Sequence, residues 1–126
     1  MCGVLLIYSK KKKLNKIVCS SASEYIKSRG PDHFFENYFL ENRLYISNSV
    51  LSIVGNINNK KKLFESKSKN FSIAFNGELY NWREIKNSNK NLLHCKNDTE
   101  LLVNMHEELN PINVAKKIEG MFAYSI

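Results

Sequence analysis

The chain has 126 residues, 43% of them hydrophobic and 11% aromatic, which predicts one modest globular domain with its own core. Its net charge is +7, but only Arg29, Arg43 and Arg83 among the nineteen basic residues are arginines, so we favour solvated lysine loops over a nucleic-acid surface. No apolar run is long enough to cross a bilayer, and the lysines follow the first apolar stretch, the reverse of a signal peptide, so we expect a cytoplasmic protein with no membrane partner.

The first half of the chain predicts mainly strands. Residues 3–7 predict a buried strand and residues 17–19 a second, short one. Ser20 to Ser23 is the expected cap of a helix that Gly30-Pro31 ends. Segments rich in β-branched and aromatic residues then predict a strand meander over 38–40, 43–47 and 50–54, followed by a basic loop over 56–62.

The second half combines strands with helices. Residues 71–75 alternate as a strand that leads into Asn76-Gly77, a turn dipeptide. Asn97 and Glu100 have the spacing of a capping box, so a helix should begin there and end at Asn110-Pro111. Its expected apolar face is Leu101, Leu102, Met105 and Leu109, with Asn104, Glu107 and Glu108 in water. A second helix is expected over 113–119 and a strand over 121–126, and a core strand at the very end suggests a fragment.

The cysteines divide into two kinds. Three cysteines without metal-ligand spacing predict neither a disulfide framework nor a metal site, and we expect Cys19 and Cys95 to be ordinary buried or half-buried thiols. Cys2 differs because methionine aminopeptidase removes Met1 before a small side chain, which leaves a thiol beside its own α-amine. Such a pair is an established nucleophile and base, since a free α-amine has a pKa of roughly 7.7 to 8.0.

Five segments stand in order along the chain: Cys2-Gly3, Arg29-Gly30-Pro31-Asp32, Asn76-Gly77-Glu78-Leu79-Tyr80-Asn81, Asp98-Thr99-Glu100 and Gly120-Met121-Phe122-Ala123. Each alone has a simple structural reading, such as a turn, a helix stop with a local salt bridge, or a first-turn acid. Together they closely resemble the class II glutamine amidotransferase domain, and within that class the asparagine synthetase (glutamine-hydrolysing) family, over essentially the whole chain.

The resemblance implies an α+β fold of the N-terminal nucleophile hydrolase type, an αββα sandwich of two antiparallel sheets between helices. Residues 1–126 would be this amidotransferase domain, truncated at its C-terminus and lacking the synthetase domain. It also implies that the thiol of Cys2 attacks the side-chain amide of L-glutamine and forms a glutamyl thioester. Asn76 and Gly77 would supply the oxyanion hole, through a side-chain amide and a backbone N–H.

The remaining implied roles concern binding of the glutamine. Glu78 and Asp98 would receive its α-ammonium group through charge-assisted hydrogen bonds, and Asp98 is free for this if Asn97 takes the helix cap. The pocket would be lined by the backbone of Leu51, Ser52, Ile53 and Val54. One residue departs from the family pattern: the arginine expected to clamp the glutamine α-carboxylate is replaced here by Val50.

The ammonia acceptor stays open at this point. The resemblance implies asparagine synthesis from aspartate, with ATP and Mg²⁺ in a synthetase domain that is supplied in cis or by a partner chain, and no cofactor in residues 1–126. Related amidotransferases act on surface-polysaccharide sugars instead. A non-catalytic, truncated or degenerate module is the alternative that Val50 and the ending at Ile126 motivate, and charge alone motivates an RNA-binding domain. A homodimer is a further expectation from the resemblance.

Overall fold

The computed structural model describes residues 2–51 and 63–126. The chain divides into two compact units. The first comprises residues 1–63, 74–76 and 125, and the second comprises residues 64–73, 77–124 and 126. Each unit is described by itself.

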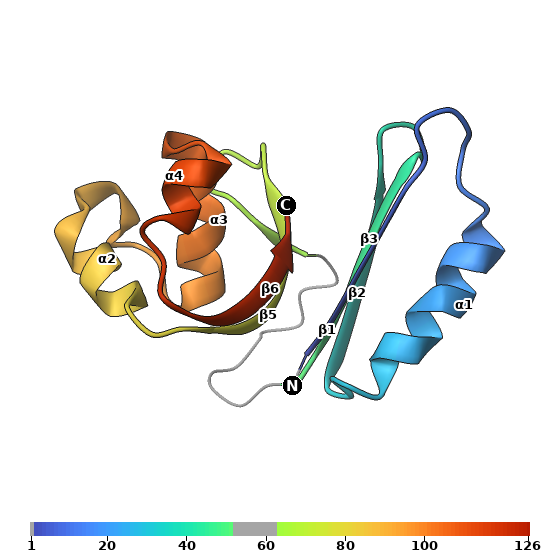
Figure 1. Cartoon of the computed structure of the whole chain (residues 1–126), viewed down its shortest axis with the longest axis horizontal. Helices are drawn as coiled ribbons and strands as arrows, with labels where there is room; N and C mark the ends of the chain where they lie inside the picture. The colour runs from blue at the N-terminus through green and yellow to red at the C-terminus, as the bar shows by residue number, and fades with distance from the viewer. Residues whose placement is uncertain (1, 52–62) are drawn as a thin grey trace. The chain divides into compact units, whose positions relative to one another are not determined.

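The first unit is a three-stranded antiparallel sheet covered on one face by a helix (Figure 1). The strands β1 (Gly3–Tyr8), β2 (His33–Phe39) and β3 (Leu44–Val50) lie in the order β1-β3-β2, and the helix is α1 (Lys16–Lys27). Gly3 and Phe34 both pair with Ser49, so Ser49 lies between the two outer strands. The predicted strand over 3–7 is confirmed.

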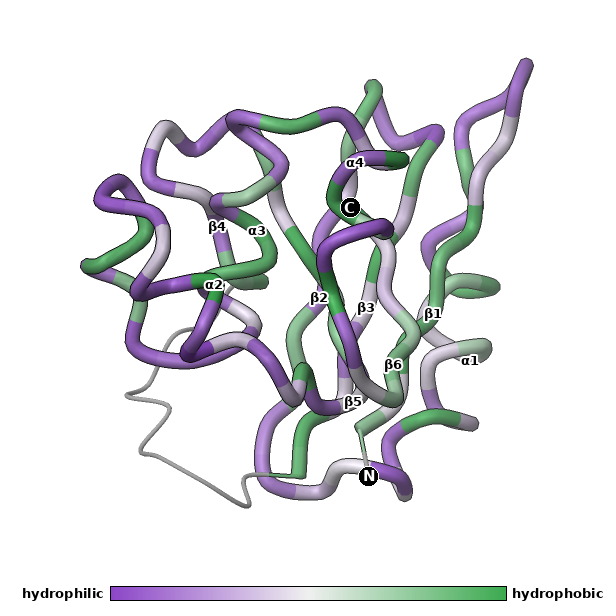
Figure 2. The backbone as a smooth tube through the Cα atoms, turned by 60° about the vertical axis from the view of Figure 1, so that its left-hand side comes forward, coloured by the Kyte–Doolittle hydropathy of each residue, from purple (hydrophilic) through white to green (hydrophobic). Residues whose placement is uncertain are grey.

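The two faces of this sheet differ in polarity. One face carries an apolar cluster of Phe35, Ile46, Leu63 and Ala74, with Val50 packed against it. On the other face, Ser23 of α1 lies 3.1 Å from the hydroxyl of Ser47 and also contacts Tyr45. Burial raises the pKa of Tyr45, whose hydroxyl donates to Glu36 at 2.6 Å. The hydrophilic segment that joins β1 to α1 contains the four lysines at 10–13 (Figure 2).

Three predictions for this unit are wrong. Ser20 to Ser23, the expected helix cap, lie inside α1, which begins at Lys16. Residues 17–19 belong to α1, because the side chain of Asn15 caps the helix and accepts hydrogen bonds from the backbone N–H groups of Ile17 (2.9 Å) and Val18 (3.4 Å). The cap outweighs the β propensity of two exposed β-branched residues. Similarly, 43–47 and the start of 50–54 are parts of one strand, β3, and residues 52–62 lie outside the described residues.

The second unit joins a small sheet to several helices. Its strands β4 (Phe64–Glu65), β5 (Ser72–Leu79) and β6 (Gly120–Ser125) lie in the order β4-β5-β6. Between β5 and β6 the chain forms α2 (Trp82–Ser88), the short 3₁₀ helix η1 (Lys90–Leu92), α3 (Asp98–Glu108) and α4 (Pro111–Ala115). Leu101, Leu102 and Met105 of α3 are buried, as predicted.

The predicted start of α3 is confirmed, and its polar face is partly wrong. The side chain of Asn97 accepts the N–H of Glu100 at 2.8 Å, while the carboxylate of Glu100 turns back to the N–H of Lys96 at 2.8 Å. Asn104 is buried and not in water, because its side chain accepts the N–H of Lys67 at 2.9 Å and donates to the carbonyl of Glu100 at 2.7 Å.

The ends of the last two elements differ slightly from the prediction. The second predicted helix begins earlier, at Pro111, since Asn110 caps it by accepting the N–H of Asn113. The expected strand over 121–126 is confirmed as β6. The α+β class with two three-stranded antiparallel sheets is thereby confirmed, whereas the stacking of the sheets stays a prediction. No helix within residues 2–51 and 63–126 combines the length and apolarity needed to span a membrane.

Candidate active site

The thiol of Cys2 lies one residue before β1 in the first unit. Cys2 is half-buried, and its Sγ lies 4.0 Å from the backbone carbonyl oxygen of Leu51. Side chains alternate along a strand, and Val4 packs against the apolar cluster, so Cys2 belongs to the same face of the sheet. The other two thiols, Cys19 and Cys95, are buried as predicted.

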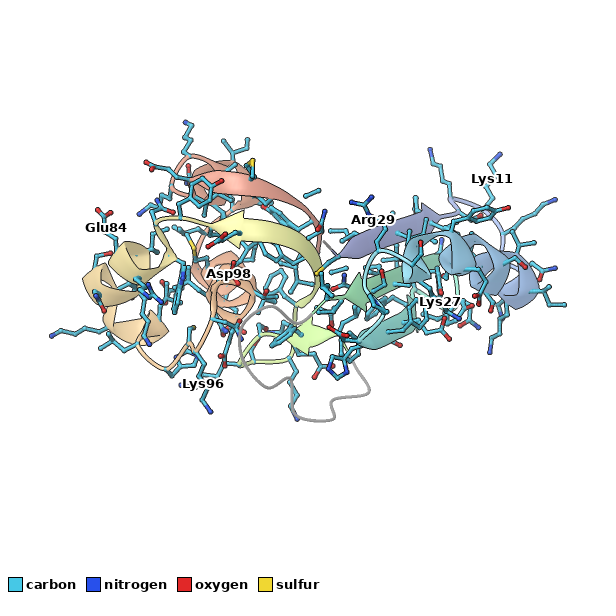
Figure 3. All side chains as sticks on the ribbon, turned by 90° about the horizontal axis from the view of Figure 1, so that it is seen from below. Lys11, Lys27, Arg29, Glu84, Lys96 and Asp98 are labelled. Carbon is cyan, nitrogen blue, oxygen red and sulfur yellow. The ribbon has the colours of Figure 1, made fainter. Side chains whose placement is uncertain are left out.

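The segment Arg29-Gly30 fixes the backbone at Cys2. The Nε of Arg29, whose side chain is exposed (Figure 3), donates to the carbonyl oxygen of Cys2 at 3.2 Å. Gly30 packs so closely on β3 that an added Cβ would lie 2.5 Å from the carbonyl carbon of Ser49. The N–H of Asp32 then donates to the carbonyl of Val50 at 3.2 Å. This segment is therefore more than a helix stop: it joins the end of α1 to the nucleophile strand.

A buried asparagine connects this region to β5. Asn48 is 5% exposed, and its Nδ2 donates to the carbonyl oxygens of Gly3 at 2.8 Å and Phe75 at 3.3 Å. Its Oδ1 accepts the N–H of Phe75 at 3.3 Å. Sequence reasoning missed Asn48, although one signal was present. It lies between Ile46 and Val50 on the alternating apolar positions of β3, where a polar side chain needs a partner.

Asn76 and Gly77 lie inside β5, so the predicted turn at this dipeptide is wrong. Gly77 has a φ of 145°, and a Cβ there would overlap the carbonyl oxygen of Met121 and lie 2.5 Å from the Cα of Phe122. The close approach of β6 therefore requires glycine at this position. The role of its backbone N–H in the oxyanion hole remains a prediction.

In the second unit, the carboxylate of Asp98 contacts the backbone of the residue that follows Glu78. An oxygen of the Asp98 carboxylate accepts the N–H of Leu79, the residue after Glu78, at 3.2 Å. The other oxygen accepts the N–H of Thr99 at 2.7 Å. The capping argument expected this carboxylate to be free for a ligand, whereas both of its oxygens accept hydrogen bonds, and the second oxygen also accepts one from the hydroxyl of Thr99 at 3.4 Å. The oxygen that faces Leu79 keeps a second lone pair for a ligand. Glu78 itself is exposed.

The remaining predicted binding residues fall at the end of β3. Leu51 is half-buried and supplies the carbonyl beside Cys2, whereas Ser52, Ile53 and Val54 lie outside the described residues. Val50 is the last residue of β3 and pairs with His33 of β2. It packs against the apolar cluster and so takes part in the core of the first unit. The arginine that the family pattern places here would offer a cation to the glutamine α-carboxylate.

Comparisons with known proteins identify the family. The family model of the glutamine amidotransferase domain matches residues 1–126, and the chain belongs to that family. An asparagine synthetase [glutamine-hydrolyzing] of Bacillus subtilis is 29% identical over 110 residues, which cover 86% of this chain and 14% of the relative. An asparagine synthetase domain-containing protein of Saccharomyces cerevisiae is 32% identical over 116 residues, covering 89% and 19%.

A plant relative extends the same pattern. The asparagine synthetase [glutamine-hydrolyzing] of Brassica oleracea is 26% identical over 129 residues, covering 98% of this chain and 21% of the relative. The chain thus spans between 14% and 21% of the length of these three relatives. It is a glutamine amidotransferase domain related to asparagine synthetases.

Proposed function

We propose that the chain hydrolyses the side-chain amide of glutamine and releases ammonia, with Cys2 as the nucleophile. The observation that carries the proposal is the setting of Cys2. Its thiol is half-buried one residue before β1, and the Nε of Arg29 donates a hydrogen bond to its backbone carbonyl oxygen at 3.2 Å. A catalytic thiol needs a fixed backbone and an open face, and the family match supplies the substrate class.

The chemistry begins with the loss of Met1. The free α-amine of Cys2 takes the thiol proton, and the thiolate attacks the amide carbon of glutamine. Negative charge develops on the amide oxygen, where the side chain of Asn76 and the backbone N–H of Gly77 are assigned as donors. The C–N bond breaks, the amine returns its proton to the departing nitrogen, and ammonia leaves a glutamyl thioester. Water then attacks the thioester, giving glutamate and the free thiol.

The roles in substrate binding are those that the resemblance to the family implies. The carboxylates of Glu78 and Asp98 would receive the α-ammonium group, and the pocket would be lined by residues 51–54. Asp98 is oriented for this role by the N–H groups of Leu79 and Thr99, which hold its two oxygens. Such fixed hydrogen bonds limit the freedom that the side chain would lose on binding a ligand.

We also propose that the ammonia serves ATP-dependent synthesis of asparagine from aspartate. The names of the relatives support this acceptor, and the synthetase domain with its ATP and Mg²⁺ would act in cis or on a partner chain. A non-catalytic amidotransferase-like module is the second candidate, and the packing of Val50 in the apolar cluster favours it. A sugar acceptor is the other possibility within the enzyme class.

A glutaminase assay on the full-length gene product tests the proposal. Cys2→Ala should lower glutamate release to the background rate, because the variant has no nucleophile. Cys19→Ala is the matched control, since it removes a buried thiol from the same unit and should keep turnover within a few-fold of the wild type. Turnover that survives in Cys2→Ala would refute the thiol mechanism, and absence of turnover in the wild type would favour the non-catalytic module.

A further inference from the structure

We propose that Asn48 is a positioning residue that holds the backbone at Cys2-Gly3 (the nucleophile segment) against the backbone of β5 at Phe75-Asn76. The inference rests on the proposed function for its catalytic consequence, and on the geometry of the first unit for the positioning itself. Asn48 would act through backbone groups: it bonds to the backbone of Gly3, which follows Cys2, and of Phe75, which precedes Asn76.

The pattern of donors and acceptors fixes the orientation of the amide. The carbonyl oxygens of Gly3 and Phe75 can only accept, so the Nδ2 must face them, at 2.8 and 3.3 Å. The N–H of Phe75 can only donate, so the Oδ1 must face it, at 3.3 Å. The Nδ2 also lies 3.4 Å from the carbonyl oxygen of Ser49. An aspartate would lose the bonds donated to Gly3 and Phe75, and an apolar residue would also lose the bond from the N–H of Phe75. Only a side chain with a donor and an acceptor satisfies both segments at once.

The location explains why a polar group is placed in an apolar row. Asn48 is 5% exposed and lies on β3 between Ile46 and Val50, which both pack in the apolar cluster. Desolvation of an amide is unfavourable unless its hydrogen bonds are replaced, and here backbone groups of β1 and β5 replace them. A hydrophobic residue would fill the row as well, but it would not tie the backbone beside Cys2 to that beside Asn76.

Asn104 offers a matched comparison in the second unit. It is 4% exposed and also uses its amide in two directions, accepting the N–H of Lys67 at 2.9 Å and donating to the carbonyl of Glu100 at 2.7 Å. Its partners adjoin none of the residues assigned to nucleophile or oxyanion. Asn48→Ala and Asn104→Ala therefore remove comparable buried hydrogen bonds, and only the first removes a tie to the nucleophile segment.

The experiment combines turnover with site-resolved alkylation of the full-length gene product. For Asn48→Ala we expect kcat for glutamine to fall about 10- to 100-fold with KM changed less than about threefold, because misplacement by an ångström has effects of that size on the chemical step. Iodoacetamide should label Cys2 about fivefold faster, since its strand is loosened, while Cys19 and Cys95 stay as protected as in the wild type. Asn104→Ala should change neither kcat nor Cys2 labelling.

Each outcome decides the question. Unchanged kcat and unchanged Cys2 labelling in Asn48→Ala would overturn the proposal, as would faster labelling of Cys2 and Cys19 together, which reports general opening of the unit. If Asn48→Ala does not fold, Asn48→Ser keeps one donor, and the same contrast between Cys2 and Cys19 applies. If the wild type shows no turnover, the proposed function fails, while the labelling pattern still decides whether Asn48 positions Cys2.

Discussion

Replacement of Gly77 by alanine should destabilise the second unit strongly. The backbone at Gly77 has a φ of 145°, which L residues rarely adopt, and holding a side chain there costs on the order of 1–3 kcal/mol. The new Cβ would also overlap the carbonyl oxygen of Met121 and lie 2.5 Å from the Cα of Phe122. Overpacking of this kind costs about 1–3 kcal/mol. The sum of the two effects is roughly 2–6 kcal/mol of unfolding free energy.

Urea unfolding followed by circular dichroism measures this loss. With a slope of about 2 kcal/mol per molar urea, a loss of about 4 kcal/mol lowers the midpoint by about 2 M. Met121→Ala is the control on the facing strand, because this side chain is 73% exposed and its removal should change stability by less than about 0.5 kcal/mol. A Gly77→Ala variant as stable as the wild type would refute the argument that β6 leaves no room for a side chain.

Three further predictions concern other parts of the chain. Burial lowers the pKa of His106 in the folded chain. The neutral side chain therefore makes its full contribution to stability above about pH 6.5, and this contribution should be lost as the pH falls below that value. His106→Gln should remove this pH dependence from urea midpoints measured between about pH 7.5 and 5.5. Val50→Arg should lower KM for glutamine about 10- to 100-fold if a cation at the end of β3 reaches the α-carboxylate, and an unchanged KM in a folded variant would contradict that role. Burial raises the pKa of Cys95 to about 11, so iodoacetamide at pH 8 should modify Cys2 well before Cys95, and the reverse order by peptide mapping would contradict the assignment of exposures.

The sequence predicted the elements whose signals are local. The cap at Asn97 and the apolar face of α3 were both readable, because capping spacing and helical periodicity involve residues within a few positions of one another. The strand over 3–7 and β6 were predicted from short apolar runs, which are also local signals. Asn15 carries an equally local signal for the start of α1, but the β-branched pair Ile17-Val18 that follows it is typical of a strand.

Long-range contacts account for most of what was missed. Helical periodicity placed Asn104 on the solvated face of α3. Nothing near it in the sequence indicates that its side chain will accept the backbone N–H of Lys67. Asn76-Gly77 was predicted as a turn because the dipeptide is typical of turns, whereas pairing with β6 keeps it within a strand. Asn48 was missed for the same reason: its partners, Gly3 and Phe75, are 45 and 27 positions away.

The most direct test of the central claim is the mass of the N-terminal peptide during turnover. The full-length gene product is mixed with glutamine, quenched in acid within one turnover and digested for mass spectrometry. The account predicts that Met1 is absent and that the peptide beginning at Cys2 carries one glutamyl group, which hydroxylamine removes. A retained Met1, or glutamine turnover with no adduct on Cys2 under conditions that trap the thioester, would contradict it.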